Sequence, residues 1–190
     1  AQAIAAKTDS IPILATAVTS YTVAGLVENE ENPGGNISGT SDMNPVAMQV
    51  DLIKELVPDA ETVGIIYNSG EDNSALQAKL AKEQIEQIGL KYAEVTVTNV
   101  NDVQQAMQSL VTKCDAIYIP TDNTLASAIA TVHGVAGEAK IPTVCGATSM
   151  VEEGGIASIG IDYYQLGYKT GLMAIDVMNG EDISTMAIQY

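Results

Sequence analysis

The sequence contains neither tryptophan nor phenylalanine, and it has one histidine and two cysteines among its 190 residues. Because the aromatic side chains are limited to eight tyrosines, the core has to be packed mainly with leucine, isoleucine, valine, methionine and alanine. The two cysteines form no Cys-x-x-Cys motif, and no set of histidines and cysteines has the spacing of a zinc site. The composition therefore predicts neither a bound metal nor a disulfide framework.

Basic residues are also scarce. Lysine and arginine together number 8, against 24 aspartates and glutamates, which gives a formal net charge of −16. A surface of this sign repels the phosphates of nucleic acids and the headgroups of anionic membranes. We therefore expect no nucleic-acid partner, although the charge does not identify a ligand.

Long hydrophobic runs are missing as well. No segment approaches the roughly 20 apolar residues of a membrane-spanning helix, and the first residues lack the charged-then-apolar pattern of a secretory signal. The chain opens with Ala-Gln-Ala-Ile-Ala-Ala-Lys, which is typical of a helix already under way. From this start we expect that the chain begins within a larger fold, or that a preceding segment was removed.

Signatures of catalysis are absent from the sequence. There is no Gly-x-Ser-x-Gly nucleophile elbow, no Gly-x-x-x-x-Gly-Lys phosphate loop and no Gly-x-Gly-x-x-Gly dinucleotide motif. The single histidine, His133, lies inside a predicted helix, where a structural role is favoured over general-base catalysis or metal binding. We therefore expect a protein that is not an enzyme and that uses no cofactor.

A recurring pattern carries the most information in this chain. Five times, an apolar, β-branched run stops at a short polar cluster, and a helix-like segment follows. In a parallel α/β sheet the carboxyl ends of the strands share one edge, and ligands bind outside that edge. The polar clusters are therefore the candidate ligand contacts. The runs cover residues 11–18, 62–67, 116–120, 142–145 and 156–161.

Strands and helices alternate regularly between residues 62 and 145, which predicts an α/β fold with a parallel sheet in flavodoxin-like order. The segment 42–155 is expected to form a complete lobe. The flanking pieces, 1–41 and 156–190, each carry strand and helix material and are expected to combine in another lobe. Helices are expected at about 21–30, 45–57, 74–87, 101–110, 125–139 and 163–178.

The two cysteines are expected to remain free. Cys114 begins one predicted strand and Cys145 ends another. If these strands are parallel neighbours, the thiols lie at opposite ends, separated by several residue rises of about 3.3 Å each. That separation exceeds the reach of a disulfide.

The polar cluster 68–74 joins a predicted strand to a long helix. Asn73 or Ser74 can cap this helix, and the free N–H groups at its start suit an anion such as a carboxylate, with Asn68 and Ser69 beside it. Capping without any ligand explains the same residues equally well.

The cluster 121–124 has the same position after another strand. A carboxylate there, Asp122, suits a ligand cation such as an amino group, and Asn123 lies beside it. Because aspartate and asparagine are also leading N-cap residues, capping is again the alternative. The remaining candidates at corresponding edges are Thr16, Val18, Thr19 and Asp162, the last of which can hold either a ligand or a hinge.

A set of segments stands in the order seen in one protein family. The segments are Ala17-Val18-Thr19, Asn32-Pro33-Gly34-Gly35-Asn36-Ile37-Ser38-Gly39, Glu55-Leu56-Val57-Pro58, Val63-Gly64-Ile65-Ile66-Tyr67-Asn68-Ser69, Thr121-Asp122-Asn123-Thr124 and Gly160-Ile161-Asp162-Tyr163-Tyr164-Gln165-Leu166-Gly167. With them the chain resembles the ABC-transporter substrate-binding proteins of the group that includes tryptophan- and tyrosine-binding lipoproteins. The resemblance covers nearly the whole chain, and the segments are specific as a set.

The resemblance implies a two-lobed type I periplasmic-binding architecture with a ligand, commonly an aromatic amino acid, held between the lobes. By similarity, Asp122 holds the ligand's α-amino group, and the Asn68-Ser69 loop, with Asn73 and Ser74, holds the carboxylate or caps its helix. Thr16 to Thr19 and Asp162 line the cleft. The implied partners are a small-molecule amino acid and an ABC permease, in an extracytoplasmic location, with membrane attachment only through a possible N-terminal lipid anchor absent from this chain.

The chain also departs from the family pattern. Ser20-Tyr21 stand where members usually have Asp-Pro, and Ala147-Thr148 stand in place of an acidic residue, so side-chain specificity is a point of difference. A family member is roughly half as long again, a size that normally splits into two lobes. The first lobe is therefore expected to be incomplete at its N-terminus.

Two other functions fit the same architecture. An effector-binding domain of a transcription regulator needs a DNA-binding headpiece, which this sequence does not contain. A small flavodoxin-like enzyme needs a cofactor site, and the flavin-stacking tryptophan is absent. Fold alone does not decide among these functions.

Overall fold

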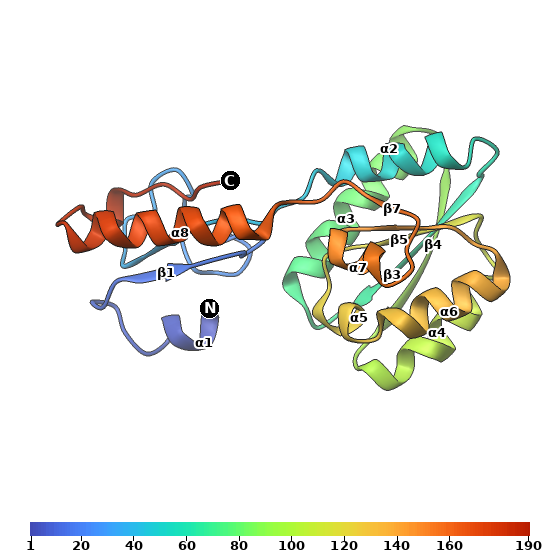
Figure 1. Ribbon diagram of the computed structural model, residues 1–190, viewed down its shortest axis with the longest axis horizontal. Coiled ribbons are helices and arrows are strands. Elements are labelled where there is room, and N and C mark those ends of the chain that lie inside the picture. Colours follow the sequence, from blue (N-terminus) through green and yellow to red (C-terminus); the bar gives the residue numbers. More distant parts are fainter. The chain divides into compact units, whose positions relative to one another are not determined.

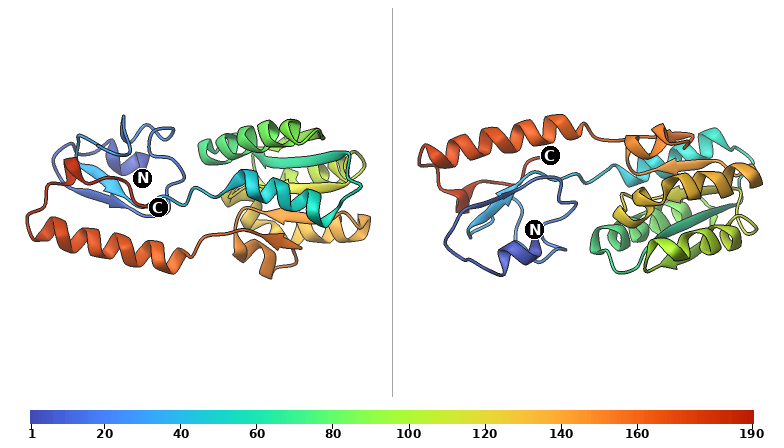
Figure 2. Two further views of the ribbon diagram at one scale, coloured as in Figure 1. Left: turned by 90° about the horizontal axis from the view of Figure 1, so that it is seen from above. Right: turned by 60° about the horizontal axis from the view of Figure 1, so that its bottom comes forward.

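The computed structural model describes all 190 residues, and the chain divides into two compact units (Figures 1 and 2). Unit 1 consists of Ala1–Met43 together with Ile161–Tyr190, and unit 2 is the continuous segment Asn44–Gly160. Both chain termini therefore belong to unit 1. Each unit has its own sheet.

Unit 2 contains a five-stranded sheet in the order β4-β3-β5-β6-β7, and every pairing is parallel. Numbered within the unit, this is the order 2-1-3-4-5 of flavodoxin-like folds, so the predicted topology is confirmed. The strands are β3 (Thr62–Asn68), β4 (Lys91–Val97), β5 (Ala116–Ile119), β6 (Thr143–Cys145) and β7 (Ala157–Ser158).

The central strands of unit 2 are buried on both faces, which is why their sequences are continuous apolar runs. In β3, Val63 and Ile65 belong to the hydrophobic cluster on one face, whereas Ile66 belongs to the cluster on the other. The same alternation separates Tyr118 from Ile117 in β5. Each strand therefore contributes to two cores at once.

Helices cover both faces of this sheet (Figure 1). Helices α2 (Val46–Leu56) and α3 (Asp72–Gln87) pack on one face, and α4 (Val103–Leu110) and α6 (Ile129–Ala139) pack on the other. The helix predicted over 125–139 is in fact two helices, because the backbone leaves helical geometry at Ala128. The shorter elements of unit 2 are η1 (Val100–Asp102), α5 (Asn123–Ser127) and α7 (Thr148–Glu152).

The position of β7 changes one expected boundary. The sequence pattern places residues 156–190 in the flanking lobe. In the structure, however, Ala157 and Ser158 pair with β6 in the sheet of unit 2. The run 156–161 is thus the fifth strand of the central sheet, shortened to two residues, and unit 2 extends to Gly160. Two glycines, Gly154 and Gly155, lie against the ring of His133 and turn the chain into this strand.

Unit 1 is much smaller in its regular structure. Its sheet pairs β1 (Ile13–Ala15) with β2 (Ile37–Gly39) in parallel, and one further bridge joins Thr40 to Gln189. The helices are α1 (Gln2–Ala5), α8 (Tyr163–Met178) and the short η2 (Ile183–Thr185). Helix α8 has the predicted bounds, and its buried side chains are Leu166 and Met173.

The helix predicted over 21–30 is wrong, because this segment forms a series of turns. Tyr21 is fully buried, and its hydroxyl donates to the carbonyl oxygens of Ala15 at 2.9 Å and Thr40 at 3.1 Å. Gly25 has a φ of +65°, in the left-handed region that ends helices. Leu26 and Val27 instead pack from turns against the small core formed by Tyr21, Ile37 and Ile188, whereas Val23 is exposed.

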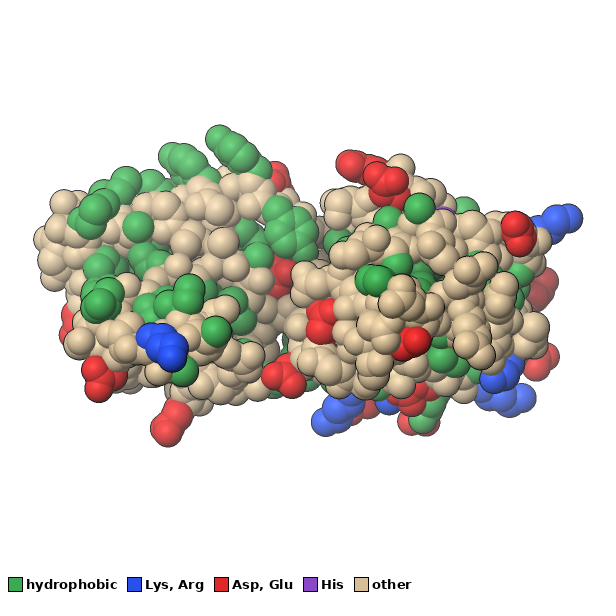
Figure 3. Space-filling view, turned by 90° about the horizontal axis from the view of Figure 1, so that it is seen from below, with side chains coloured by type: hydrophobic (Ala, Val, Ile, Leu, Met, Phe, Trp, Pro, Cys, Tyr) green, Lys and Arg blue, Asp and Glu red, His purple; other side chains and the backbone are tan.

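Unit 1 exposes many large apolar side chains, visible as green atoms in Figure 3. On α8, Tyr164 is 76% exposed and Met178 is 77% exposed. The same helix also exposes Tyr168, Leu172 and Ile175, which lie at helical spacing along one side. None of the helices combines the length and apolarity needed to cross a membrane.

Both cysteines are free and buried. Cys114 lies just before β5, whereas Cys145 pairs with Ile119 at the far end of that strand. The predicted placement of the thiols at opposite ends of neighbouring strands is therefore confirmed.

Candidate functional site

The carboxyl edge of the unit 2 sheet brings together polar residues that are far apart in sequence. The backbone N–H of Asn68, at the end of β3, donates to Oδ2 of Asp122, which follows β5, at 2.7 Å. The side-chain amide of Asn68 donates to Oγ1 of Thr124 at 2.8 Å. The predicted clusters 68–74 and 121–124 therefore meet at one edge, as the parallel topology requires.

Asp122 lies at the centre of this edge but is only 2% exposed. Its Oδ1 accepts the backbone N–H of Leu125 at 2.8 Å, which makes it the N-cap of α5. Its Oδ2 accepts the N–H of Asn68. Both carboxylate oxygens are thus engaged by backbone donors, and this geometry favours capping and positioning over direct contact with a ligand.

Asn73 and Ser74 lie in the first turn of α3. The amide of Asn73 donates to the carbonyl oxygen of Thr121 at 2.8 Å and to Oγ of the buried Ser74 at 3.3 Å. Neither residue caps α3, because Glu71 occupies the N-cap position and makes no side-chain cap hydrogen bond. The predicted capping role is therefore wrong, and Asn73 instead joins α3 to the segment that follows β5.

The Glu71 carboxylate faces the start of α5 instead. It accepts hydrogen bonds from the backbone and side chain of Asn123 and from the backbone and hydroxyl of Thr124, at 2.8–3.1 Å. Burial alone would raise the pKa of Glu71, but these hydrogen bonds hold it below its ordinary value. The predicted ligand contact Asn123 is thus engaged by an internal carboxylate, whereas Ser69 is exposed beside it.

Two further amide side chains complete this edge. They are not among the ligand contacts predicted from the sequence. Asn44 donates to Oγ1 of Thr121 at 2.9 Å, and Oε1 of Gln77 accepts the N–H of Thr121 at 3.1 Å. Gln77 is fully buried, and its Nε2 has no acceptor. Its place one turn after Asn73, on the same face of α3, is the sequence signal that identifies it.

Unit 1 has a polar edge of its own after β1 and β2. Thr16 and Thr40 share a hydrogen bond between their hydroxyls at 3.2 Å. Val18 takes part through its backbone N–H, which donates to the carbonyl oxygen of Thr40 at 3.2 Å. The predicted candidates Thr16, Val18 and Thr19 therefore lie together, as expected for the end of a strand.

Thr19 contacts a buried carboxylate, that of Asp42, which is not among the ligand contacts predicted from the sequence. Its hydroxyl donates to Oδ1 of Asp42 at 2.9 Å, and the Tyr163 hydroxyl donates to Oδ2 at 3.2 Å. Burial raises the pKa of Asp42 above its ordinary value, although these hydrogen bonds oppose the shift. A sequence signal is present, because Asp42 comes shortly after the extended segment Ile37–Gly39, as the other polar clusters come after their strands.

Asp162 stands at the start of α8. Its side chain is exposed, and Oδ1 accepts the backbone N–H of Gln165 at 3.0 Å, so that it caps α8. The neighbouring Tyr163, not Asp162, reaches the Asp42 carboxylate.

The family model for ABC transporter substrate binding proteins matches residues 1–190. The chain belongs to this family.

Individual relatives of this chain are closely similar. The tyrosine-binding protein of Clostridioides difficile strain R20291 is 40% identical over 188 residues, which are 99% of this chain and 54% of that protein. A conserved domain protein from Vibrio cholerae has a TM-score of 0.95 and 41% identity, covering 99% of this chain and 64% of that one. A Streptococcus pneumonia domain in complex with L-Trp has a TM-score of 0.95 and 38% identity, covering 99% and 65%.

The chain spans about half the length of the curated relative it matches. More distant structures share the fold alone. They include an ABC transporter solute binding protein from Bacillus halodurans, with a TM-score of 0.66 and 16% identity, and a LacI family regulator from Bifidobacterium animalis, with 0.60 and 12%. These likenesses confirm the expected type I periplasmic-binding fold, and the family match favours the substrate-binding interpretation over the regulator.

Polar contacts elsewhere in the chain have structural explanations. The His133 ring contacts the carbonyl oxygen of Met150 at 2.8 Å and the Thr143 hydroxyl at 3.4 Å, which fastens the turn before β7. No group of three or more His, Cys, Asp or Glu side chains is placed to hold a metal ion.

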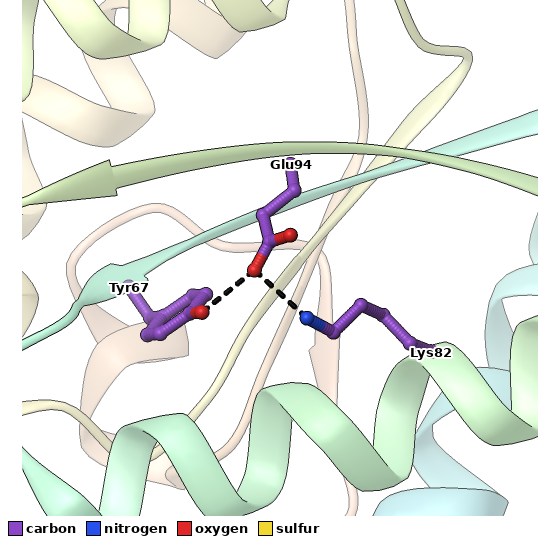
Figure 4. Close-up of polar contacts among 3 residues, drawn as sticks. All are labelled: Tyr67, Lys82 and Glu94. Atoms are coloured by element: carbon purple, nitrogen blue, oxygen red, sulfur yellow. Dashed lines mark hydrogen bonds and ion pairs between the residues drawn. The ribbon is translucent and has the colours of Figure 1, made fainter.

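A second charged cluster joins edge strand β4 to α3 (Figure 4). The Glu94 carboxylate accepts from the Tyr67 hydroxyl at 2.6 Å and from Lys82 at 2.9 Å. Burial and this contact raise the pKa of Tyr67 to about 12. Glu94 pairs with Ile65 midway along strands β4 and β3. Its contacts therefore lie away from the carboxyl edge, and they fasten the edge strand β4.

Proposed function

We propose that this chain is the ligand-binding part of an extracytoplasmic solute receptor that captures an amino acid for an ABC importer. The proposal is supported by the family match over all 190 residues and by two similar proteins, one named tyrosine-binding and one solved with L-Trp. In this proposal the chain is a receptor and not an enzyme. Its partners are an ABC permease and a small zwitterion, in a protein that carries a lipid anchor in its full-length form.

The observation that carries the proposal is the chemistry of the two carboxyl edges. They present amide and hydroxyl groups from separate elements, and they contain aspartates, but no lysine takes part in either network. Such neutral donors suit the carboxylate of an amino acid, and an aspartate suits its ammonium group. All eight basic residues are lysines, so the bidentate arginine contact common in carboxylate sites is excluded.

The predicted contacts keep different roles within this proposal. Ser69 is exposed at the edge of unit 2 and Thr16 at the edge of unit 1, so these side chains are proposed to contact the ligand. Thr19 is buried and is proposed to position the edge of unit 1. Asn68, Asn73, Ser74, Asp122 and Asn123 are proposed to position that edge through the hydrogen bonds described above.

Calorimetric titration of the protein with a panel of amino acids tests the function. We expect saturable binding of at least one aromatic amino acid with a Kd in the micromolar range or below, about −8 kcal/mol. The mass of any small molecule that is released from the purified protein by denaturation gives an independent identification. A folded protein that binds no amino acid at roughly 1 mM, the weak end of specific recognition, would overturn the proposal.

A further inference from the structure

Helix α8 is apolar on two opposite sides. Its inner side buries Leu166 and Met173. Positions two residues away from these lie roughly on the opposite side of a helix with 3.6 residues per turn, and there the side chains are again large and apolar. The outer face of α8 consists of side chains that are between 46% and 77% exposed, namely Tyr164, Tyr168, Leu172, Ile175 and Met178.

Helix α3 provides a direct contrast with this face, because both helices have 16 residues. The exposed residues of α3 are all polar, namely Asp72, Lys79, Glu83, Glu86 and Gln87. In α8 only Lys169 and Asp176 carry a charge, and neither belongs to the outer face. Apolar side chains on both sides of a helix are typical of a helix that is covered on both sides, and a contiguous exposed apolar patch marks an interaction site.

The sheet of unit 1 is open beside this helix. Strand β2 has β1 on one side and the bridge to Gln189 on the other, and no strand pairs with the outer edge of β1. The three residues of β1, Ile13–Ala15, are only half-buried. Helix α8 contacts β1, and in both views of Figure 2 it runs along one side of unit 1. The open strand edge and the outer face of α8 therefore belong to neighbouring parts of one unit.

The geometry of this surface suits a strand followed or preceded by a helix. The pairings in unit 1 are parallel, and parallel strands are joined by crossover connections, which are usually helices. The backbone of α8 is accessible to such a helix, because nothing lies within 4 Å of a Cβ added at Gly167 or Gly171, which are one turn apart. Glycines between large side chains form a groove into which the side chains of another helix can pack.

The relatives contain further polypeptide beyond the matched part. The Vibrio cholerae and Streptococcus pneumonia chains match 99% of this chain at a TM-score of 0.95, so they contain the elements of unit 1, α8 included. This chain covers only 64% and 65% of them, which leaves at least 35% of each relative outside the match. A segment of the same polypeptide docks at a high effective concentration. A second copy of this chain, in contrast, carries a formal charge of −16 and is repelled.

We propose that the outer face of α8 and the open edge of β1 form a docking surface for a strand–helix segment of the same polypeptide. The strand pairs in parallel with β1, and the apolar stripe of the helix packs on α8 across Gly167 and Gly171. The family resemblance predicts only that this lobe is incomplete, whereas the docking surface is the place where it is completed. The inference does not depend on the ligand.

Tyrosine reactivity in the full-length polypeptide that the gene encodes tests this surface. Tetranitromethane nitrates accessible tyrosines, and mass spectrometry of the peptides follows each one. We expect Tyr164 and Tyr168 to react about tenfold more slowly than Tyr92, which corresponds to a docking free energy of roughly 1.4 kcal/mol. Tyr92, in unit 2, is the internal control, because it is only 39% exposed and reacts more slowly than the other two if nothing covers α8.

A charged substitution provides a second test in the same polypeptide. Ile175→Glu places a carboxylate in the outer face, and we expect it to lower the Tm by about 5 °C or more, because the docked helix buries that charge. Met48→Glu is the matched control, since Met48 is a similarly exposed apolar residue on α2 of unit 2. It should change the Tm by no more than about 1 °C. Equal effects of the two substitutions would contradict the proposal.

Sedimentation at decreasing protein concentration identifies the molecule that covers the face. Protection of Tyr164 and Tyr168 that persists in the monomer supports docking within one polypeptide. Protection that is lost as a dimer dissociates would assign the face to a second copy and overturn the proposal. Nitration of both tyrosines faster than Tyr92 in the monomer would overturn it as well, and so would a gene that encodes no strand–helix segment beyond these residues.

Discussion

The two units of this chain are stabilised in different ways. Unit 2 has five strands with helices on both faces and two hydrophobic clusters, whereas unit 1 has two short strands and a core of three buried side chains. Apolar burial dominates in unit 2. Unit 1 relies on hydrogen bonds between segments distant in sequence, such as the bond from the Ser38 hydroxyl to the carbonyl oxygen of Met186 at 2.6 Å.

The difference shows where a folded unit is sensitive to change. A unit built on apolar burial loses stability when its side chains are shortened. A unit built on close backbone contacts loses stability when those contacts are obstructed or their donors are removed. The predictions below are arranged from the largest expected effect to the smallest.

Gly39→Ala should be the most damaging single substitution. Gly39 has a φ of +143°, and a Cβ added there would lie 1.8 Å from the carbonyl oxygen of Ala15 and 2.5 Å from the Tyr21 hydroxyl. We expect a loss of about 4 kcal/mol or more, with unit 1 unfolded and unit 2 intact. Hydrogen exchange read by mass spectrometry, peptide by peptide, checks this outcome.

Gly25→Ala is the matched control for that substitution. Gly25 also has a positive φ, of +65°, but nothing lies within 4 Å of an added Cβ. The cost should be limited to the backbone strain of about 1–2 kcal/mol. Similar losses for Gly25→Ala and Gly39→Ala would show that close packing does not govern unit 1.

Ile65→Ala should cost about 2–5 kcal/mol, because Ile65 is fully buried in one of the two hydrophobic clusters of unit 2, and this cluster is larger than the one in unit 1. Ile37→Ala in unit 1 should fall at the low end of this range, about 2 kcal/mol, since fewer buried side chains surround it. Guanidinium unfolding curves measure both values. If Ile37→Ala proves as costly as Ile65→Ala, then unit 1 depends on apolar burial as much as unit 2 does, which contradicts the comparison above.

Asp122→Ala should destabilise unit 2 by about 2–4 kcal/mol, because it removes the cap of α5 and leaves the N–H of Asn68 without its acceptor. Amino-acid affinity should decrease only to the extent that the loss of these hydrogen bonds disorders the carboxyl edge of the unit 2 sheet. Calorimetry beside a thermal melt separates these effects. Full stability with lost affinity would instead restore the direct ligand contact predicted from the sequence.

Tyr21→Phe should cost about 0.5–1.5 kcal/mol and act on unit 1 alone. The carbonyl oxygens of Ala15 and Thr40 lose the hydroxyl donor, but each keeps a backbone donor, at 3.0 and 3.2 Å, which limits the loss. Tyr168→Phe, on the exposed side of α8, is the control and should be neutral. A greater effect in Tyr168→Phe would contradict this account of unit 1.

Glu94→Gln should have the smallest effect, under about 1 kcal/mol, because its ion pair with Lys82 is partly exposed. Burial raises the pKa of Glu94, but hydrogen bonds from Tyr67 and Lys82 hold it below its ordinary value. Its stabilising contribution is therefore present above the unfolded pKa, about 4.3, and is lost as the pH falls through the lower folded value. The difference in Tm between the variant and the unchanged protein, followed from pH 7 to roughly pH 3, should shrink accordingly.

The sequence predicts unit 2 well because its elements are long and its pattern is local. The strands 62–67 and 116–120 are recovered almost to the residue, and so is the strand order. The short strand β7 was assigned to the wrong unit because two residues carry too little pattern to identify a pairing partner.

Unit 1 and the chemistry of the site were predicted less completely. The apolar spacing in 21–30 resembles a helix, yet the hydrogen bonds of Tyr21 to Ala15 and Thr40 decide the backbone there. At the site, the pattern located the edges but not the orientation of each side chain. Asp42 and Gln77 each have a local signal, but their importance arises from burial and from distant partners, which that signal does not reveal.

The division into one continuous and one discontinuous unit has a consequence for synthesis. Every contact within unit 2 joins residues between Asn44 and Gly160, so its sheet can form as soon as that stretch has emerged from the ribosome. Unit 1 cannot close then, because β2 is bonded to Met186 and Glu30 is bonded to Ile188. The part of unit 1 before Asn44 must wait, without its final partners, until the part after Gly160 is made. Unit 2 is thus free to assemble before unit 1 closes.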